Sequence, residues 1–368
     1  MQLLESLGHW LLAYESFATA FAGRSPPRRE YFYVGGEYKN MTLGNTTDLY
    51  MVGQIYVEKL TPANASRAHP IVFVHGSAQT ATNWLETPDG RPGWASFFLD
   101  HGFTVYLSDQ PSRGRSPWHP SVGSMTAISA PFIETYFTAT SDHELWPQSR
   151  LHTQWPGTGH VGDPTFDAFY SAQVQFQGDE LISEETNAKA YSALLDKVGK
   201  SFLLTHSQSG AYGWRVGDAR PRLVQGIISL EPSGPPFLGW PVPTPSRPWG
   251  LTNLAMEYEP PAGPNATYME TVTVPAKDAN HTDCILQSEP AKKLKNLADV
   301  PVLAMTGEAS FHAPYDYCTA GYLQQAGVGV EHVELGKEGI KGNGHMLFME
   351  KNNLQIAGRV LRWMEEHA

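Results

Sequence analysis

A serine on a sharp turn between a strand and a helix is the feature of this sequence with the clearest chemistry. The apolar run Phe202–Leu204 predicts a buried strand, the small-residue turn at 205–210 follows it directly, and a helix is expected from residue 212. Such a nucleophile elbow presents the hydroxyl of its central serine, here Ser207, for nucleophilic attack. It also aims the next backbone N–H, that of Gln208, at the point where an oxyanion would form.

The elbow motif can be aligned with this turn in two ways, which differ in the serine that would be the nucleophile. Small residues flank Ser207 in the pattern Thr205-x-Ser207-x-Ser209, where Gly-x-Ser-x-Gly is the usual form. The frame Ser207-x-Ser209-x-Ala211 would make Ser209 the nucleophile instead. Ser207 is favoured because it comes directly off the strand, with His206 before it.

The elements around this turn alternate between strands and helices, and two irregular stretches interrupt them. The apolar runs predict strands at 70–76, 103–108, 202–204, 223–230, 300–307 and 328–335. Continuous apolar runs are typical of parallel strands buried on both faces. The alternation predicts an α/β fold with a mostly parallel central sheet and helices on both faces. An antiparallel hairpin at 30–38 and 49–60 is expected at the sheet edge.

The domain organisation follows from the same pattern. Residues 30–116 and 180–368 are expected to form the core, and residues 1–29 an N-terminal extension. Residues 117–179 are too long for a plain connection and are interpreted as a lid or cap insertion over the carboxyl edge of the sheet. Residues 233–290 are interpreted as a second irregular insertion within the core. Trp, Phe and Tyr in both insertions indicate a covered apolar pocket.

The N-terminal stretch Leu3–Ala22 is fairly apolar, but it contains Glu5, His9 and Glu15 and lacks a basic start. It is therefore a poor signal peptide, and an amphipathic helix or the remainder of a truncated leader is expected there. No run of 18 apolar residues exists, so no transmembrane span is predicted.

The composition excludes some classes of function. The chain has 368 residues, 41% of them hydrophobic, which suits one large α/β domain with insertions or two domains. Its formal net charge is −11 and it has no basic block. Nucleic-acid binding is not expected, because it requires a basic surface.

Cysteines and sequons point to an oxidising compartment. The glycosylation sequon Asn-x-Ser/Thr occurs more often than chance predicts, at Asn40, Asn45, Asn64, Asn265 and Asn280. This favours the eukaryotic secretory route, with the cytoplasm as the alternative. Cys284 and Cys318 are too few for a disulfide scaffold and lack metal-ligand spacing. We predict that they pair with each other, because an oxidising compartment permits it and both lie near the strand at 300–307.

The order of three motifs resembles the α/β-hydrolase superfamily. His75-Gly76 ends one strand, Ser207 lies on an elbow, and His345 lies in a glycine-rich loop before the final helix, with residues 109–116 between the first two. The resemblance covers roughly residues 30–116 and 180–368. It implies the α/β-hydrolase fold and hydrolysis of an ester, lactone, amide, epoxide or similar bond.

The stretch from Thr80 to Ser116 is more specific. With Trp84, the Thr-Pro-Asp-Gly-Arg sequence at 87–91 and Gly93-Trp94, it resembles an esterase-like branch of serine hydrolases found in bacteria and fungi. Asp109 and Arg113 in this stretch are expected to tie the neighbouring loop together.

The remaining catalytic groups can be placed on the superfamily pattern. Of the 14 histidines, only His345 follows the last strand in a Gly-Asn-Gly loop, and it is the candidate base. His75 and His206 are expected to pack or hydrogen-bond locally as support. The second oxyanion donor is expected to be the N–H of Ser77 or of Ala78, after His75-Gly76.

Two carboxylates compete for the role of the acid that orients His345. Glu308 follows the strand that usually carries it, but the typical Asp a few residues further on is absent. Glu231 follows the strand after the elbow helix, from which a minority of the superfamily, including the resembled branch, takes its acid. We favour Glu231 and keep Glu308 as the alternative.

The predicted function is that of a serine hydrolase that cleaves a carboxylic ester or lactone of a hydrophobic small molecule through an acyl-enzyme. The alternative is a biosynthetic enzyme on the same fold that catalyses cyclisation, acyl transfer or elimination. A non-catalytic binding protein is less favoured, since Ser207, His345 and a carboxylate are all present. No metal or organic cofactor is implied, and the oligomeric state stays open, with a homodimer as one option.

Overall fold

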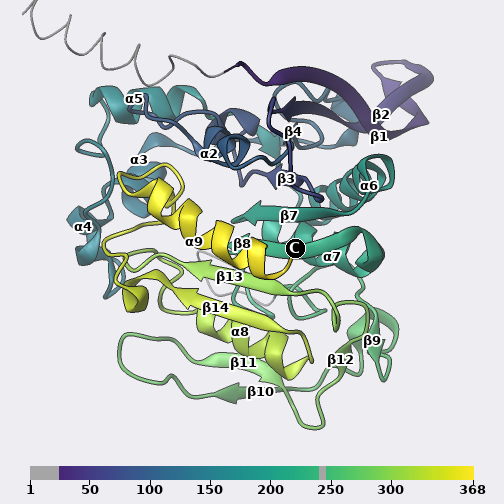
Figure 1. The fold of residues 1–368 in the computed structure, drawn as a ribbon. Helices are drawn as coiled ribbons and strands as arrows, with labels where there is room; N and C mark the ends of the chain where they lie inside the picture. The colour runs from purple at the N-terminus through teal and green to yellow at the C-terminus, as the bar shows by residue number, and fades with distance from the viewer. Residues whose placement is uncertain (1–24, 240–245) are drawn as a thin grey trace, which may run out of the picture.

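An eight-stranded sheet forms the centre of the protein in the computed structural model, which describes residues 25–239 and 246–368 (Figure 1). Its strands, in spatial order, are β1 (Arg28–Leu43), β2 (Thr46–Thr61), β4 (Val105–Asp109), β3 (Ile71–Val74), β7 (Ser201–His206), β8 (Val224–Leu230), β13 (Val302–Thr306) and β14 (Val330–Glu334). The six strands from β4 to β14 run parallel, and β1 and β2 add an antiparallel edge. The predicted fold class is confirmed.

Helices cover both faces of the sheet, as the apolar runs require. In the buried strand β3, Phe73 packs into one apolar cluster and Val72 into the other, because successive side chains point to opposite faces. The first cluster is covered by helices α2 (Trp94–Asp100) and α9 (Asn353–Glu366). The second is covered by α6 (Glu180–Val198), α7 (Ser209–Ala219) and α8 (Asp316–Gln325).

The edge hairpin is longer than predicted. Strands β1 and β2 stay paired from Arg28 opposite Thr61 to Leu43 opposite Thr46. Residues 42–49 at its far end are exposed and mostly polar, so no hydrophobic alternation marks them in the sequence. Backbone hydrogen bonding alone continues the ladder there.

The segment between β4 and α6 is built from short elements. These are η2 (Pro120–Val122), β5 (Met125–Thr126), α3 (Ala130–Ile133), η3 (Glu134–Thr138), α4 (Thr140–His143), η4 (Ser149–Leu151), α5 (Pro164–Ser171) and β6 (Phe176–Gln177). Figure 1 shows α3, α4 and α5 at the carboxyl ends of the parallel strands. Hydrogen bonds to the core hold the segment there, among them those from Trp146 Nε1 to the carbonyl of Ala309 at 3.0 Å and from the Thr153 N–H to the carbonyl of Gly342 at 3.0 Å.

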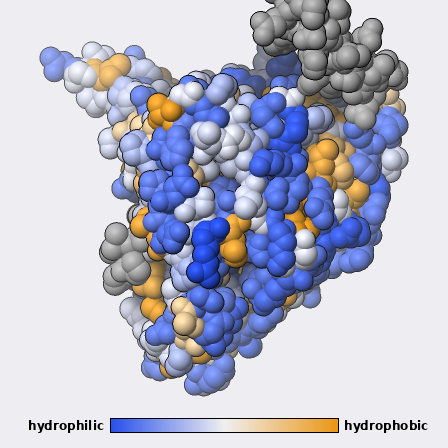
Figure 2. Space-filling view, turned by 90° about the vertical axis from the view of Figure 1, so that its left-hand side faces the viewer, coloured by the Kyte–Doolittle hydropathy of each residue, from blue (hydrophilic) through white to orange (hydrophobic). Residues whose placement is uncertain are grey.

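The outer surface of this segment is mainly polar. Figure 2 shows that side of the molecule, where hydrophobic residues form small areas within a mostly hydrophilic surface. Exposed large hydrophobic residues of the segment are Trp118, Leu145, Leu151 and Val161. Among the described residues, no helix is both long enough and apolar enough to cross a membrane.

A second irregular stretch follows β8. Its short elements are β9 (Tyr258–Glu259), η6 (Pro264–Ala266), β10 (Thr271–Val274), β11 (Cys284–Gln287) and β12 (Lys293–Leu294). Three further short helices lie elsewhere in the chain, η1 (Ala81–Trp84), η5 (Pro221–Leu223) and η7 (Leu335–Glu338). Cys284 in β11 is bonded to Cys318 in α8, so the predicted disulfide is confirmed. Closing a loop over a separation of 34 residues typically stabilises a fold by about 2–4 kcal/mol.

The remaining predictions about the surface concern the sequons and the N-terminus. All five sequon asparagines are exposed, namely Asn40, Asn45, Asn64, Asn265 and Asn280. The predicted helix or truncated leader at Leu3–Ala22 lies outside the described residues. Of the extension 1–29, residues 25–29 are described, and β1 already begins at Arg28.

Candidate active site

Ser207 lies on a strained turn between β7 and α7. Its φ of 57° is in the left-handed region, which costs a residue with a side chain about 1–3 kcal/mol. Surrounding backbone holds it there: the Ser207 N–H donates to the carbonyl of Leu230 at 3.0 Å, and the Ser207 carbonyl accepts from Gly210 and Ser233. A Cβ on Gly210 would lie 2.5 Å from Cβ of Pro232, so this position requires glycine. The small residues of the motif therefore permit a sharp turn pressed against the end of β8.

The two serines of the turn have different surroundings. Ser209 is fully buried, and its Oγ accepts from the His206 N–H at 2.8 Å and lies 2.9 Å from the carbonyl oxygens of Val74 and His206. Ser207 is partly exposed and lines a cavity. The structure thus places Ser207 toward free space and Ser209 within the backbone scaffold.

His345 and Glu231 are in direct contact. His345 Nδ1 lies 2.6 Å from Glu231 Oε2, and both side chains are buried. The imidazole packs against Phe137 and Phe311, with ring centroids 4.8 and 4.6 Å away. Burial lowers the pKa of His345 well below its ordinary value, and nearby His206 and His312 lower it further. His345 is therefore neutral at neutral pH, the form in which it can accept a proton.

Glu231 is held by donors at the end of β8. Besides His345, its carboxylate accepts from the Gly307 N–H at 2.7 Å and from Ser310 Oγ at 2.6 Å. Burial and the neighbouring Asp316 raise the pKa of Glu231 well above its ordinary value, while the bonds from Ser310 and Gly307 oppose that shift. Those donors favour the ionised form, which is the form that orients an imidazole.

The carboxylate of Glu308 is bonded to groups other than His345. It pairs with Lys341 Nζ at 2.8 Å and accepts from the Gly342 N–H at 2.9 Å. Of the two candidate acids, the structure brings Glu231 against His345 and leaves Glu308 at the base of the His345 loop.

The turn after β3 packs directly on the elbow. A Cβ on Gly76 would lie 2.9 Å from His206 Nδ1 and 3.1 Å from Ser207 Cβ, so only glycine allows this approach. Ser77 and Gln208 line the same cavity as Ser207. Ala78 is buried with a φ of 58°, and its carbonyl accepts from the Val174 N–H at 2.8 Å. The backbone around the candidate oxyanion hole is thus closely confined.

Arg113 links the two halves of that backbone. It is buried, with Nη1 donating to the carbonyl of Gly76 at 2.7 Å and Nη2 to Gln208 Oε1 at 2.6 Å. Burial lowers its pKa to about 10, so it is still a cation at neutral pH. Asp109 accepts from the N–H groups of Ala81 and Arg115, at 2.9 Å in each case. Both residues therefore tie the loops together, as expected from the sequence.

His75 and His206 lie behind the site. His75 Nε2 accepts from the Gln110 N–H at 3.1 Å, and His206 Nε2 lies 3.0 Å from the carbonyl of His345. Burial lowers the pKa of each to about 3. They are neutral groups that hold neighbouring loops, in line with the support roles expected for them.

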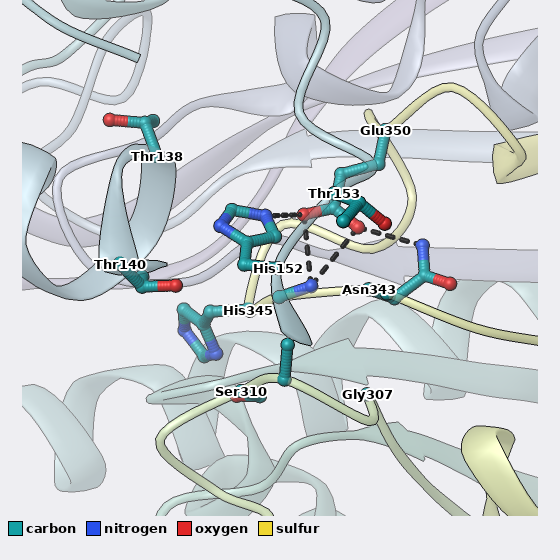
Figure 3. A network of polar contacts seen from close by, with 12 residues as sticks. Thr138, Thr140, His152, Thr153, Gly307, Ser310, Asn343, His345 and Glu350 are labelled. Atoms are coloured by element: carbon teal, nitrogen blue, oxygen red, sulfur yellow. Dashed lines mark hydrogen bonds and ion pairs between the residues drawn. The ribbon is translucent and has the colours of Figure 1, made fainter. Parts of the chain in front are cut away.

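Two further buried pairs of a histidine and a carboxylate were not predicted from the sequence. His312 Nδ1 lies 2.8 Å from Asp316 Oδ1, and the His312 ring stacks on His345 with centroids 5.0 Å apart. His152 Nε2 lies 2.7 Å from Glu350 Oε1, which also accepts from the Gly344 N–H at 3.0 Å (Figure 3).

Glu350 thereby anchors the loop of His345 to the segment between β4 and α6. Its other oxygen accepts from Asn343 Nδ2 at 2.7 Å, as Figure 3 shows. His312 and Asp316 are four residues apart near the start of a helix, and this spacing was the sequence signal that could have indicated their pairing. No local pattern marks Glu350, because its partners are distant in sequence or lie in an irregular loop.

Glu231, His312 and His345 could also converge on a metal ion, since one ligand atom of each lies within 4.8 Å of the others. However, Glu231 and His345 are hydrogen-bonded to each other, and His312 is bonded to Asp316. Their arrangement therefore suits proton transfer between paired groups.

The cavity at Ser207 has a volume of about 340 Å³. Its apolar wall is formed by Ile128, Phe132, Phe137, Phe176 and Phe311. A larger cavity of about 530 Å³ lies between the β1–β2 hairpin and α6, apart from the residues described above. The smaller cavity is the one that Ser207 lines.

Comparison with known proteins identifies the family. No family model matches the sequence. The chain is 62% identical over 348 residues, 92% of each protein, to "Probable secreted lipase phiG" of a fungus (Fungal sp., strain ATCC 74256). Among solved structures, a bacterial esterase matches with a TM-score of 0.63 and 23% identity, over 94% of this chain and 98% of that one, which shows a shared fold. The chain therefore belongs to the same family as the probable secreted lipase phiG and is a hydrolase with the α/β-hydrolase fold.

Proposed function

We propose that this protein is a serine hydrolase that cleaves a carboxylic ester or lactone of a hydrophobic small molecule. Ser207 is the nucleophile, His345 the base and Glu231 the acid. The observation that carries the proposal is the 2.6 Å contact between His345 and Glu231, two buried groups at the strand ends where Ser207 also lies.

The reaction would proceed in two steps. His345 Nε2 takes the proton of Ser207 while Oγ attacks the substrate carbonyl, and the oxyanion is bound by the N–H groups of Gln208 and of Ser77 or Ala78. His345 then gives its proton to the leaving alcohol, and an acyl-enzyme forms. A water molecule, deprotonated by His345, releases the acid and restores Ser207. Glu231 stabilises the imidazolium in both steps.

The nature of the substrate is suggested by the cavity wall. Three phenylalanines, Phe132, Phe137 and Phe311, face the space next to Ser207 and would pack on an apolar acyl or alcohol group. The relative phiG is named a lipase, which agrees with an apolar ester. Because Phe132 and Phe137 belong to residues 117–179, we propose that this segment serves as the cap of the site, with residues 233–290 as the second insertion.

Secretion is part of the proposal. The relative phiG is named as secreted, and the disulfide between Cys284 and Cys318 is of a kind that is rare in the cytosol. Exposure of all five sequons would make glycosylation at these asparagines sterically permissible.

Covalent labelling tests the proposed chemistry directly. A fluorophosphonate should modify the enzyme once, and peptide mass spectrometry should locate the label on Ser207. A panel of p-nitrophenyl esters of graded chain length should then show turnover that labelling abolishes. Failure to label, or a label on Ser209, would contradict the proposal. An acyl-enzyme that passes its acyl group to an added alcohol in preference to water would indicate the biosynthetic alternative.

The pH profile should extend to acid pH. His345 acts as a base only when neutral, and burial lowers its pKa, so it stays neutral further below pH 6.5 than an exposed histidine does. We expect kcat/KM for a neutral ester to fall on the acid side with an apparent pKa below 6.5, a value that belongs to the His345–Glu231 pair. An acid limb centred at pH 7 or above would contradict this assignment.

A further inference from the structure

Two buried arginines lie around the elbow with no carboxylate partner among the residues that the structure describes. Arg113 and Arg247 are 2% and 6% exposed, and they are the buried arginines of the described residues. Neither forms an ion pair with any acidic side chain in the described part of the chain. A buried charge without a counterion is costly, so both cations call for an explanation.

Arg113 is explained by the elbow. Its guanidinium donates to Gly76 and Gln208, lies 5.2 Å from the ring centroid of Phe176, and fixes the backbone of the candidate oxyanion hole. It is not among the residues that line the cavity. Its role is therefore to position the loops.

Arg247 has no comparable role. Among the described residues, its guanidinium donates only to the carbonyl of Leu238, although a guanidinium carries five N–H donors. Its backbone is fixed in the left-handed region with a φ of 51°, by a bond from its N–H to Asn253 Oδ1 at 3.2 Å and by one from the Gly250 N–H to its carbonyl at 2.8 Å. These bonds fix the backbone from which the side chain projects, and the bond to the carbonyl of Leu238 holds the guanidinium in place.

That place is the wall of the cavity that holds Ser207. Arg247 and Tyr315 form a polar part of this wall, whereas the phenylalanines form its apolar part. The positive charge of Arg247 opposes the rise in the pKa of Tyr315 that burial, Asp316 and Glu231 produce, so the two side chains are close. The other charged or titratable side chains on the wall are Glu180, which is exposed, and His312, which is bonded to Asp316.

We propose that this cavity takes esters that carry a carboxylate, and that Arg247 binds this carboxylate. The substrate carboxylate would be the counterion that the described residues do not supply, bound by a charge-assisted hydrogen bond from the guanidinium, while the phenylalanines would pack on the carbon skeleton. The inference rests on the proposed function, since the carboxylate belongs to a substrate of Ser207. It narrows the substrate from any hydrophobic ester to an acidic one.

The test compares esters that differ only in charge. With carboxylate on the acyl side, the pair is mono-p-nitrophenyl adipate and its methyl ester; on the alcohol side, it is 4-acetoxybenzoate and its methyl ester. We expect kcat/KM to favour the charged member of at least one pair by about tenfold or more. Arg247→Gln should lower this charged-to-neutral ratio by about 10- to 100-fold, mainly through KM, and Arg247→Lys should retain part of it.

Arg222→Gln is the matched control. Arg222 is exposed and lies in η5, before the amino end of β8, whereas Ser207 lies at the carboxyl ends of the strands. This variant removes the same charge from the protein and should leave the ratio unchanged. If Arg222→Gln lowers the ratio as much as Arg247→Gln does, net charge and not Arg247 sets the preference, and the inference is wrong.

A measurement on the wild-type enzyme covers the case in which Arg247→Gln does not fold. Hexanoate should inhibit hydrolysis of p-nitrophenyl acetate at least about tenfold more strongly than hexanamide, because only the former carries the charge. Hydrolysis of all four esters without a preference, or equal inhibition by both compounds, would overturn the inference and leave the proposed function intact. A stronger preference for phosphate monoesters over carboxylates would also overturn it. Failure to hydrolyse any ester would refute the proposed function itself.

Discussion

Replacing Ser207 by alanine is expected to lower kcat for ester hydrolysis by about 10⁵- to 10⁶-fold, because removing the nucleophile of a triad leaves only binding and oxyanion stabilisation. The fold should survive. The turn depends on the backbone of Ser207, which bonds to Leu230, Gly210 and Ser233, and alanine keeps all of these bonds. Kinetics with a p-nitrophenyl ester, together with thermal unfolding and circular dichroism, measure the two effects separately.

Ser209→Ala is the control for this variant. Ser209 Oγ is bonded to three backbone groups of β3 and β7 and is fully buried. Its removal leaves the His206 N–H and the carbonyls without that partner, which should cost about 1–3 kcal/mol of the free energy of unfolding. Activity should remain within about tenfold of wild type below the unfolding transition. A nearly inactive Ser209→Ala enzyme beside an active Ser207→Ala enzyme would show that the shifted frame is correct.

The second large effect is expected for Glu231→Gln, which should lower kcat by about three to four decades with little change in KM. The amide is close in shape to the carboxylate, so the packing at the end of β8 should persist. It cannot stabilise the imidazolium of His345, and an amide NH₂ facing His345 Nδ1 would favour the wrong tautomer. Steady-state kinetics at a pH near 7 test this expectation.

Glu308→Gln provides the comparison at the neighbouring strand end. Glu308 pairs with Lys341 and the Gly342 N–H, and so supports the loop of His345 without touching its imidazole. We expect kcat to fall by less than about tenfold, since a partly exposed ion pair contributes little. A nearly inactive Glu308→Gln enzyme together with an active Glu231→Gln enzyme would reverse the assignment of the acid.

Much of the fold could be predicted because it depends on local patterns. The apolar runs around Phe73, Leu203 and Ile227 are long enough for buried strands and too short for helices, and their alternation with helices implies a parallel sheet. The last helix, Asn353–Glu366, likewise carries its buried apolar side chains at helical spacing, which is a local pattern. The elbow was recognisable because only small residues permit a turn this tight.

Local patterns in the sequence identify the residues that could act as nucleophile and base, but they do not show which of the alternative residues lie in contact in the folded protein. Glu231 and Glu308 both follow parallel strands, and no local pattern separates them. The register of β8 and β13, with Leu230 opposite Met305, brings Glu231 beside Gly307, where its carboxylate reaches His345. The contact of Glu350 with His152, and the cavity that Arg247 shares with Ser207, likewise join residues far apart in the chain. Such contacts depend on strand register and loop packing, because burial and hydrogen bonding between distant segments have no period that a linear sequence could display.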